Sequence, residues 1–252
     1  MGKPLDGQTV LVTGASGGIG AAIVEQLAAD GARPIIHYGR DKTKADALLA
    51  HIDGKGVIVQ SDLSSRDGAF ELWRRAIDAT GRIHDLVNGA GIRTEVTVDD
   101  SIDDWHAAWQ REFQVNFFSA VDLCREAIKH FGENGGGRIV NMTSRAGQRG
   151  YAANAMPYGA AKSALANLTK SIARSFAADG VTAVNIAPGW VLTDMAAEYV
   201  EKHGKLTAVA EIPIGEMAMP SEVAELVSFV LRRSQVSLNG ATVDVNGGSY
   251  IR

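Results

Sequence analysis

A glycine-rich turn between an apolar segment and an amphipathic one constrains the fold of this chain more than any other feature. The apolar residues Thr9–Val12 lead into Thr13-Gly14-Ala15-Ser16-Gly17-Gly18-Ile19-Gly20, where a helical pattern begins. Glycine has no Cβ, so backbone N–H groups in such a turn can approach a ligand closely, and the helix N-terminus favours an anion. The turn therefore predicts a phosphate-binding loop between a strand and a helix.

The spacing of the glycines narrows the type of loop. No Gly-Lys-Ser/Thr ends it, so it is not a P-loop, and G-x-x-x-G-x-G differs from the G-x-G-x-x-G of longer dinucleotide-binding domains. Its place directly after a strand supports pyrophosphate binding. The alternative is a strand-to-helix turn without a ligand. The candidate cofactor-binding residues of the loop are Gly14, Ser16, Gly17, Gly18, Ile19 and Gly20.

Short apolar segments alternate with longer amphipathic ones along the whole chain. The candidate strands are Thr9–Val12, Pro34–His37, Gly56–Val59, Asp85–Val87, Arg138–Met142, Val181–Ile186 and Ala241–Val245. The helical patterns lie near 18–30, 42–52, 65–80, 101–131, 155–178 and 221–233. Such alternation is typical of a parallel sheet flanked by helices. With 252 residues and no linker or repeat, residues 1–252 are predicted to form a single α/β domain with seven strands.

Charge and residue content exclude several classes of partner. The formal net charge is −4 and no long basic run occurs, so we expect neither nucleic acid nor an anionic membrane as a partner. Residues 7–24 are uncharged, but glycines and polar residues interrupt them, so no export signal is expected. The single cysteine, Cys124, is expected in the core of a cytoplasmic protein. The six histidines are scattered, and no metal site is predicted.

The segment after the second strand indicates which dinucleotide is bound. A carboxylate there accepts a hydrogen bond from a free 2′-hydroxyl, whereas a guanidinium suits a 2′-phosphate. Here Tyr38 stands near the acidic position and Arg40 follows it, which favours NADP(H). NAD(H) is the alternative if Arg40 is only an exposed loop cation. After the third strand, Asp62-Leu63 is interpreted either as a contact to the adenine amine or as a helix cap.

Three side chains further along fit proton transfer. Ser144 follows the fifth strand, and Tyr158 and Lys162 lie four residues apart on one face of the next long helical pattern. We expect the ammonium of Lys162 to lower the pKa of Tyr158 toward the working pH, which would make the tyrosine a general acid or base. A Tyr-x-x-x-Lys pair alone is common on helix surfaces, so its combination with the serine and the glycine loop carries the prediction.

These motifs, in this order and over essentially the whole chain, resemble the short-chain dehydrogenase/reductase family, in particular 3-oxoacyl-carrier-protein reductases and small carbonyl reductases. The matching motifs are Thr13–Gly20, Asp62-Leu63, Asn88-Gly89-Ala90-Gly91, Asn116, Ser144, Tyr158, Lys162 and Pro188-Gly189. The resemblance implies a Rossmann-like, doubly wound sheet in three α/β/α layers. It also implies a homotetramer, and hydride transfer between nicotinamide and a ketone or secondary alcohol.

The resemblance also implies roles for individual residues. Tyr158 would protonate the carbonyl oxygen, Ser144 would hydrogen-bond it, Lys162 would hold the nicotinamide ribose, and Asn116 would hold a water of the proton relay. Further implied cofactor contacts are Asn88, Ala90, Gly91, Pro188, Gly189, Val191 and Thr193, the last at a phosphate. The family usually has two asparagines where this chain has Asn88-Gly89, and we expect that turn to be looser.

The substrate is the part that the sequence defines least. The candidate pocket residues are Arg93, Gln148, Met156 and Trp190, with Arg145 and Arg149 either attracting an anionic substrate or serving as surface cations. Residues 190–219 are expected to form a lid, with a plain packing role as the alternative. The leading expectation is reduction of a 3-oxoacyl thioester or a similar small ketone. The alternatives are a sugar, polyol or other hydroxy-compound dehydrogenase, and a non-catalytic nucleotide-sensing protein on the same fold.

Overall fold

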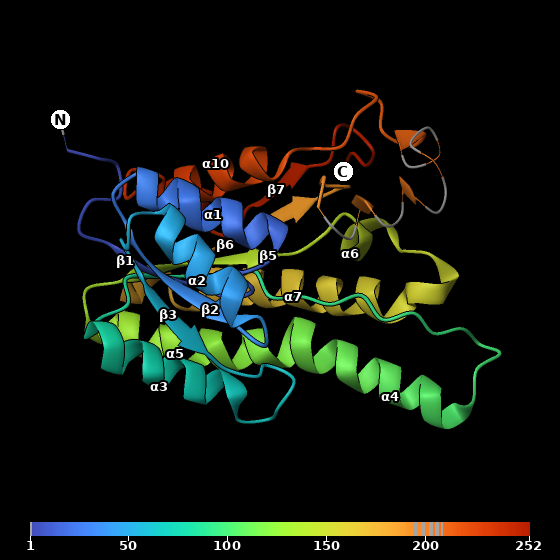
Figure 1. Cartoon of the computed structure of the whole chain (residues 1–252), viewed down its shortest axis with the longest axis horizontal. Coiled ribbons are helices and arrows are strands. Elements are labelled where there is room, and N and C mark those ends of the chain that lie inside the picture. The colour runs from blue at the N-terminus through green and yellow to red at the C-terminus, as the bar shows by residue number, and fades with distance from the viewer. Residues whose placement is uncertain (1, 194–195, 198–199, 202–203, 205–206, 208) are drawn as a thin grey trace.

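Seven parallel strands form one sheet in the order β3-β2-β1-β4-β5-β6-β7 in the computed structural model, which describes residues 2–193, 196–197, 200–201, 204, 207 and 209–252 (Figure 1). The strands are β1 (Thr9–Val12), β2 (Arg33–Tyr38), β3 (Val57–Gln60), β4 (Asp85–Asn88), β5 (Gly137–Met142), β6 (Val181–Pro188) and β7 (Thr242–Val245). All seven predicted strands are confirmed, with bounds shifted by no more than two residues.

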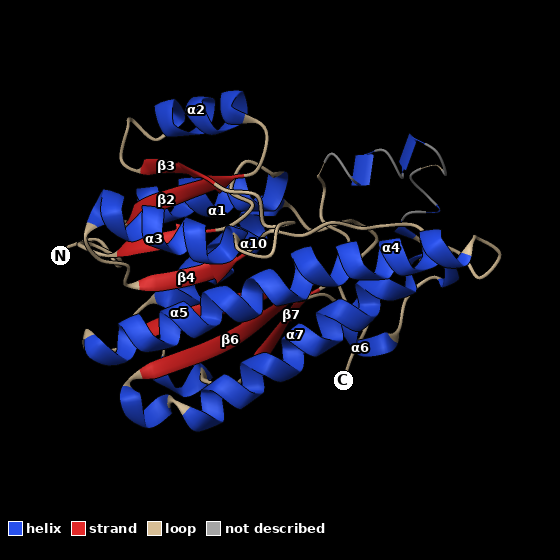
Figure 2. Ribbon diagram, turned by 90° about the horizontal axis from the view of Figure 1, so that it is seen from below, coloured by secondary structure: helices blue, strands red, loops and turns tan. Residues whose placement is uncertain are grey.

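Helices cover both faces of this sheet. They are α1 (Gly18–Ala29), α2 (Lys42–His51), α3 (Gly68–Thr80), α4 (Ile102–Phe113), α5 (Ser119–Glu133), α6 (Ala146–Arg149), α7 (Met156–Ser175) and α10 (Pro220–Leu231). Helices α1, α2 and α10 lie against one face, and α3, α5 and α7 lie against the other (Figures 1 and 2). The predicted doubly wound, three-layer α/β/α architecture is therefore confirmed.

The central strands contribute to two separate hydrophobic cores. In β1, Val10 and Val12 pack with α1 and α10, whereas Leu11 faces the core formed with α3 and α5. In β2, Ile36 and Ile35 divide between the two cores in the same way. A strand that is covered on both faces has no polar side, which explains why the sequence shows continuous apolar segments there.

The order of the strands places the glycine-rich turn at a natural binding position. Strand β1 lies between β2 and β4, so successive crossovers run in opposite directions from it. Open α/β sheets bind ligands beyond the carboxyl ends of their strands, where this reversal leaves a crevice. Both the turn after β1 and residues 89–91 after β4 lie at this edge of the sheet.

The long helical pattern predicted over 101–131 is not one regular helix. Between α4 and α5, Gln114–Phe118 forms a π-helical turn. Such turns are rare and occur often at functional sites. Asn116 lies inside this turn, and the short helix α6, which the pattern did not predict, follows Ser144. The amphipathic pattern shows no break at this turn, so the interruption was not predicted.

The structure also bears on the cysteine, on membrane spans and on metal sites. Cys124 is buried in α5, as predicted, and burial raises the pKa of its thiol to about 12, so it is an unreactive core residue. In the described part of the chain no helix is long and apolar enough to cross a bilayer, and no group of three or more His, Cys, Asp or Glu residues is arranged to hold a metal ion.

Candidate active site

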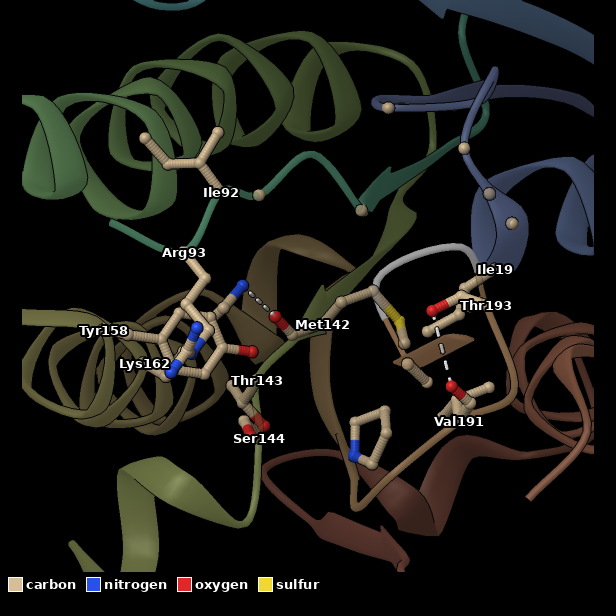
Figure 3. Close-up of a pocket in the computed structure, with 18 of the residues that line it drawn as sticks. Ile19, Ile92, Arg93, Met142, Thr143, Ser144, Tyr158, Lys162, Val191 and Thr193 are labelled. Carbon is tan, nitrogen blue, oxygen red and sulfur yellow. Dashed lines mark hydrogen bonds between the residues drawn. The ribbon is translucent and has the colours of Figure 1, made fainter. Parts of the chain in front are cut away.

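A cavity of about 490 Å³ opens at the carboxyl edge of the sheet, where the strand order reverses (Figure 3). Figure 3 shows Ser144, Tyr158 and Lys162 on one side of it and Ile19 and Thr193 on the other. The lining comes from distant parts of the sequence: Gly14, Ser16–Gly20, Gly89, Gly91–Arg93, Met142–Arg145, Tyr151, Tyr158, Lys162, Pro188–Val191, Thr193 and Ala196. The cavity therefore joins the glycine-rich loop to the three residues predicted for proton transfer.

Not every predicted site residue lines this cavity. Arg93 and Trp190 do, and so does Arg145, whereas Met156 and Arg149 do not. Gln148 is directed elsewhere, because its Nε2 donates a hydrogen bond to Asp244 Oδ1 (3.1 Å). The predicted cofactor residues that lie outside the lining are Tyr38, Arg40, Asp62, Leu63, Asn88 and Ala90, and the relay residue Asn116 lies outside it too.

The glycine-rich loop has the geometry of a phosphate cradle. Gly14 has φ +65°, and a Cβ there would lie 2.7 Å from the Cα of Ala90. A Cβ on Gly20 would lie 2.2 Å from the carbonyl oxygen of Gly14, so only glycine allows this tight return of the chain. Gly17 is the N-cap of α1 and makes no side-chain cap, and Gly17–Ile19 line the cavity. The N-terminus of α1 therefore faces the cavity and fits a dinucleotide pyrophosphate.

His37 braces this loop, a role that sequence reasoning missed. Its Nδ1 accepts a hydrogen bond from the backbone N–H of Gly14 (3.1 Å), and its Nε2 donates to the carbonyl of Ser61 (3.2 Å). Burial lowers the pKa of His37 to about 4, so the ring is neutral at physiological pH and can accept at one nitrogen while donating at the other. The sequence signal that could have indicated this role is a histidine within an otherwise apolar strand.

The family usually holds this turn with two asparagine side chains, but here Asn88-Gly89 is held by the Thr13 hydroxyl and by the single amide of Asn88. The hydroxyl oxygen of Thr13 accepts hydrogen bonds from the N–H groups of Gly89 and Ala90, both at 3.0 Å. The Asn88 amide donates to Asn141 Oδ1 (2.8 Å), which ties β4 to β5. A Cβ at position 89 would lie 2.8 Å from the carbonyl oxygen of Thr13. The glycine thus permits a close contact between two loops, and the expected loosening is offset by the Thr13 bonds.

The three residues predicted for proton transfer lie together. Tyr158 shares a side-chain hydrogen bond with Ser144, and its ring lies 5.8 Å from the ammonium of Lys162. Lys162 Nζ donates to the carbonyl oxygen of Met142 (2.8 Å), which fixes the ammonium at the end of β5 (Figure 3). A second tyrosine, Tyr151, stacks obliquely against Tyr158 with 5.5 Å between ring centroids. The phenol, the serine and the ammonium therefore converge at one end of the cavity.

The pKa of Tyr158 moves in the opposite direction to the sequence-based expectation. Burial raises it to about 12, interactions with Tyr151 and Glu112 raise it further, and the bond with Ser144 and the charge of Arg93 lower it only in part. Burial also lowers the pKa of Lys162 to about 8. The expectation was wrong for the protein without a bound dinucleotide, because desolvation of the phenolate outweighs the nearby positive charges.

Asn116 anchors the chain after β4. Its Oδ1 accepts from the N–H of Ile92 (2.8 Å), and its Nδ2 donates to the Ile92 carbonyl (2.9 Å) and to Glu112. The side-chain amide is thus engaged on every side.

Arg40 and Asp62 are exposed residues that follow β2 and β3. Asp62 Oδ1 accepts hydrogen bonds from the N–H (2.9 Å) and the hydroxyl (2.6 Å) of Ser64, so it closes a turn before α3, whose N-cap is Asp67. These bonds, followed by the charge of Arg40, lower the pKa of Asp62. Arg40 therefore lies within electrostatic range of Asp62, where a 2′-substituent of adenosine is expected.

The described ends of the predicted lid are paired with each other. Leu192 donates a backbone hydrogen bond to Ala218 (2.9 Å), and Ala218 donates to Trp190 (3.0 Å). Thr193 lies against the glycine loop, since a Cβ on Gly18 would lie 2.9 Å from its methyl group. Residues 194–195, 198–199, 202–203, 205–206 and 208 lie outside the described part of the chain.

Comparison with known proteins identifies relatives over nearly the full length. A family model described as short chain dehydrogenase matches residues 8–204. The chain is 35% identical over 250 residues to a 3-oxoacyl-[acyl-carrier-protein] reductase of Synechocystis sp., with 97% of each protein covered. It is 34% identical over 252 residues to a cis-4-hydroxycyclohexanecarboxylate dehydrogenase of Sinomonas cyclohexanicum, with 98% of each covered.

A solved structure extends this likeness to the fold. The crystal structure of the angucycline C-6 ketoreductase LanV with bound NADP matches with a TM-score of 0.87 at 26% sequence identity, and the match covers 99% of this chain and 98% of LanV. The family match spans most of the chain, and the motifs it contains are those assembled around the cavity. The chain therefore belongs to the short chain dehydrogenase family.

Proposed function

We propose that this protein is an NADP(H)-dependent oxidoreductase that reduces a ketone to a secondary alcohol. The observation that carries the proposal is the convergence of Ser144, Tyr158 and Lys162 at one end of a cavity whose other end is a glycine-built phosphate cradle. A nicotinamide dinucleotide supplies the hydride when bound. The protein's own residues then have to orient the carbonyl and deliver a proton to its oxygen.

Each of these residues has a distinct task in the proposed reaction. Tyr158 donates its proton to the carbonyl oxygen as hydride arrives at the carbon, and a hydroxyl with a pKa of about 12 carries that proton throughout the physiological pH range. Ser144 hydrogen-bonds the same oxygen and stabilises its developing charge. Lys162, a cation below its pKa of about 8, favours the phenolate that Tyr158 leaves behind. Asn116 holds the segment after β4 in place beside them.

Arg40 supports the preference for NADP(H). It is exposed beyond the end of β2, where no carboxylate precedes it to accept a ribose 2′-hydroxyl. Replacing Arg40 by alanine is expected to raise the KM for NADPH by about tenfold or more, and to change the KM for NADH by less than about threefold, because the lost charge-assisted bonds are made to a 2′-phosphate. Steady-state kinetics with both cofactors measures this. Arg66→Ala, which removes an exposed cation from the loop before α3, is the control.

The lining of the cavity favours an acyl ketone over a sugar or polyol. Polyhydroxy compounds are bound by acceptor side chains, and no Asp, Glu, Asn or Gln is among the described lining residues. The substrate end instead has apolar surface from Ile92 and Trp190 and two cations, Arg93 and Arg145, which pair with Glu95 and Glu211 at its rim. Such a pocket suits a 3-oxoacyl thioester or a related ketone with an anionic part.

A substrate panel tests the proposal. We expect NADPH-dependent turnover of 3-oxoacyl thioesters and small keto esters, and much slower oxidation of sugars and polyols with either oxidised cofactor. Turnover confined to sugars or polyols would instead support a hydroxy-compound dehydrogenase. Tight NADPH binding, measured by fluorescence, without turnover of any compound would support a non-catalytic nucleotide sensor.

The family resemblance also leads us to propose a homotetramer in the cytoplasm. An aromatic ladder on α4 and the π-helical turn supports a subunit contact, with ring centroids 5.4 to 6.3 Å apart. Its members are Trp105, Trp109, Phe113, Phe117 and Phe118, and Phe118 is 48% exposed. Exposed apolar surface of this kind often marks a protein contact.

A further inference from the structure

A buried carboxylate lies behind the active site. Glu112 is 0% exposed, on α4, one turn before Asn116. A fully buried glutamate is rare unless its charge and its oxygen atoms are matched by partners. None of the sequence motifs includes it, and the roles proposed above do not use it.

Both carboxylate oxygens of Glu112 are hydrogen-bonded to the active-site framework. Oε2 accepts from the backbone N–H of Thr94 (2.8 Å), and Oε1 accepts from the amide of Asn116. Asn116 in turn holds both backbone groups of Ile92. The carboxylate and the amide together fix the segment 92–94, from which Arg93 reaches the cavity.

The charge of Glu112 acts on the catalytic lysine. The charged and titratable groups that face Glu112 and Lys162 are Tyr158 from α7 and Arg93 from the loop after β4. The charge of Glu112 also raises the pKa of Tyr158 directly, so its support of proton transfer acts through Lys162. Burial lowers the pKa of Lys162 to about 8, and the negative charge of Glu112 opposes that shift. Burial likewise raises the pKa of Glu112, while the bonds from Thr94 and the charges of Lys162 and Arg93 oppose it.

Gly91 lies beside both the Asn116 amide and the Lys162 ammonium and places no side chain between them. A Cβ on this glycine would lie 3.1 Å from Asn116 Oδ1 and 3.5 Å from Lys162 Nζ. The carboxylate, the amide and the ammonium thus form a continuous polar group behind Tyr158. In such a low-dielectric setting a carboxylate has a larger effect on a nearby cation than it would in water.

We propose that Glu112 is a positioning residue of the active site, whose charge keeps the ammonium of Lys162 protonated and whose two hydrogen bonds hold Asn116 and the segment 92–94. The proposal builds on the proposed ketone reductase, in which Lys162 must be a cation to favour the Tyr158 phenolate. Its electrostatic part concerns the protein without cofactor and can be measured without turnover.

The direct test is the titration of Lys162 in the free protein. Lysines labelled with a carbon isotope at Cε are followed by NMR as pH is raised, and Lys162→Arg assigns the signal. In Glu112→Gln, the loss of the negative neighbour is expected to lower the titration midpoint of Lys162 by about one pH unit. Glu95→Gln, which neutralises an exposed carboxylate paired with Arg93, is expected to leave the midpoint unchanged. An unchanged midpoint in Glu112→Gln overturns the proposal.

The activity of the same variants separates this role from a purely structural one. In Glu112→Gln, the fall of kcat on the alkaline side is expected about one pH unit lower than in the wild type, so the loss is several-fold greater near pH 8 than near pH 6. A loss by the same factor at every pH would show a structural role only. Glu112→Asp retains the charge and is expected to restore the midpoint. If Glu112→Gln does not fold, Glu112→Met removes the same charge with an apolar side chain and is judged by the same two results.

The turnover assay and the Lys162 titration test the two proposals independently. If no ketone is turned over, the proposed function is wrong, but the Lys162 titration still decides whether Glu112 controls the ammonium. If turnover occurs and the midpoint does not move, the proposed function stands and the role of Glu112 is refuted.

Discussion

Replacing Tyr158 by phenylalanine is expected to lower kcat for ketone reduction by about 10²–10⁴-fold, the range of a positioned general acid, while the Kd for NADPH changes by less than about threefold. The substitution removes the proton donor and its bond with Ser144 but keeps the ring, which is packed 5.5 Å from Tyr151. Steady-state kinetics gives kcat, and fluorescence titration gives the Kd.

A matched control is the same change at the neighbouring tyrosine. Tyr151 lines the same cavity, but its hydroxyl is near Arg93, and Ser144 bonds to Tyr158. Tyr151→Phe is therefore expected to change KM for the ketone more than kcat, with kcat within about tenfold of the wild type. If Tyr158→Phe keeps wild-type kcat, another group delivers the proton and the proposed mechanism is wrong.

The sequence predicted the fold because its signals are local. Short continuous apolar segments such as Thr9–Val12 have the length of a strand, longer amphipathic ones such as residues 18–30 have a helical pattern, and the structure confirms both. The π-helical turn at Gln114–Phe118 was missed for the same reason. It adds a residue to one turn without breaking the amphipathic pattern, so it becomes visible only in the backbone.

The roles of Glu112 and His37 could not be predicted from local patterns. On an isolated helix, Glu112 looks like one more polar position of α4, and its burial arises from packing against α7 and the loop after β4. His37 looks like a stray polar residue in a strand, until Gly14 and Ser61 come within hydrogen-bond distance from other segments. Both roles depend on contacts between segments that are distant in the sequence.

The electrostatic expectation for Tyr158 failed because it counted only one of two opposing effects. The spacing of Tyr158 and Lys162 correctly placed a cation beside the phenol. It contained no information on burial, which removes water from the phenolate and raises the pKa to about 12. A tyrosine with this pKa holds its proton at neutral pH, as the proton donor of the proposed reduction must.

Substituting alanine for Gly20 is expected to disrupt the phosphate cradle itself. A Cβ at this position would lie 2.2 Å from the Gly14 oxygen and 2.9 Å from the Ala15 Cα, and both are backbone atoms that cannot move aside cheaply. We expect a loss of about 2–4 kcal/mol in the free energy of unfolding, seen as a fall in Tm of roughly 5–15 °C, together with at least about a tenfold rise in the Kd for NADPH. Differential scanning calorimetry and fluorescence titration measure the two quantities.

Substitutions at two other glycines distinguish an effect on stability from an effect on NADPH binding. At Gly17 an added Cβ meets just one described atom within 4 Å, the Gly14 oxygen at 3.5 Å, so Gly17→Ala should lower the Tm much less than Gly20→Ala, by no more than the loss of a favourable N-cap. Its methyl group would nevertheless stand at the N-terminus of α1, which faces the cavity, so NADPH binding should still weaken. Gly132→Ala, in α5 with nothing described within 4 Å, should stabilise the protein by about 0.5–1 kcal/mol and leave binding unchanged. If Gly17→Ala binds NADPH as the wild type does, the pyrophosphate does not lie at this helix end, and the assignment of the cradle is wrong.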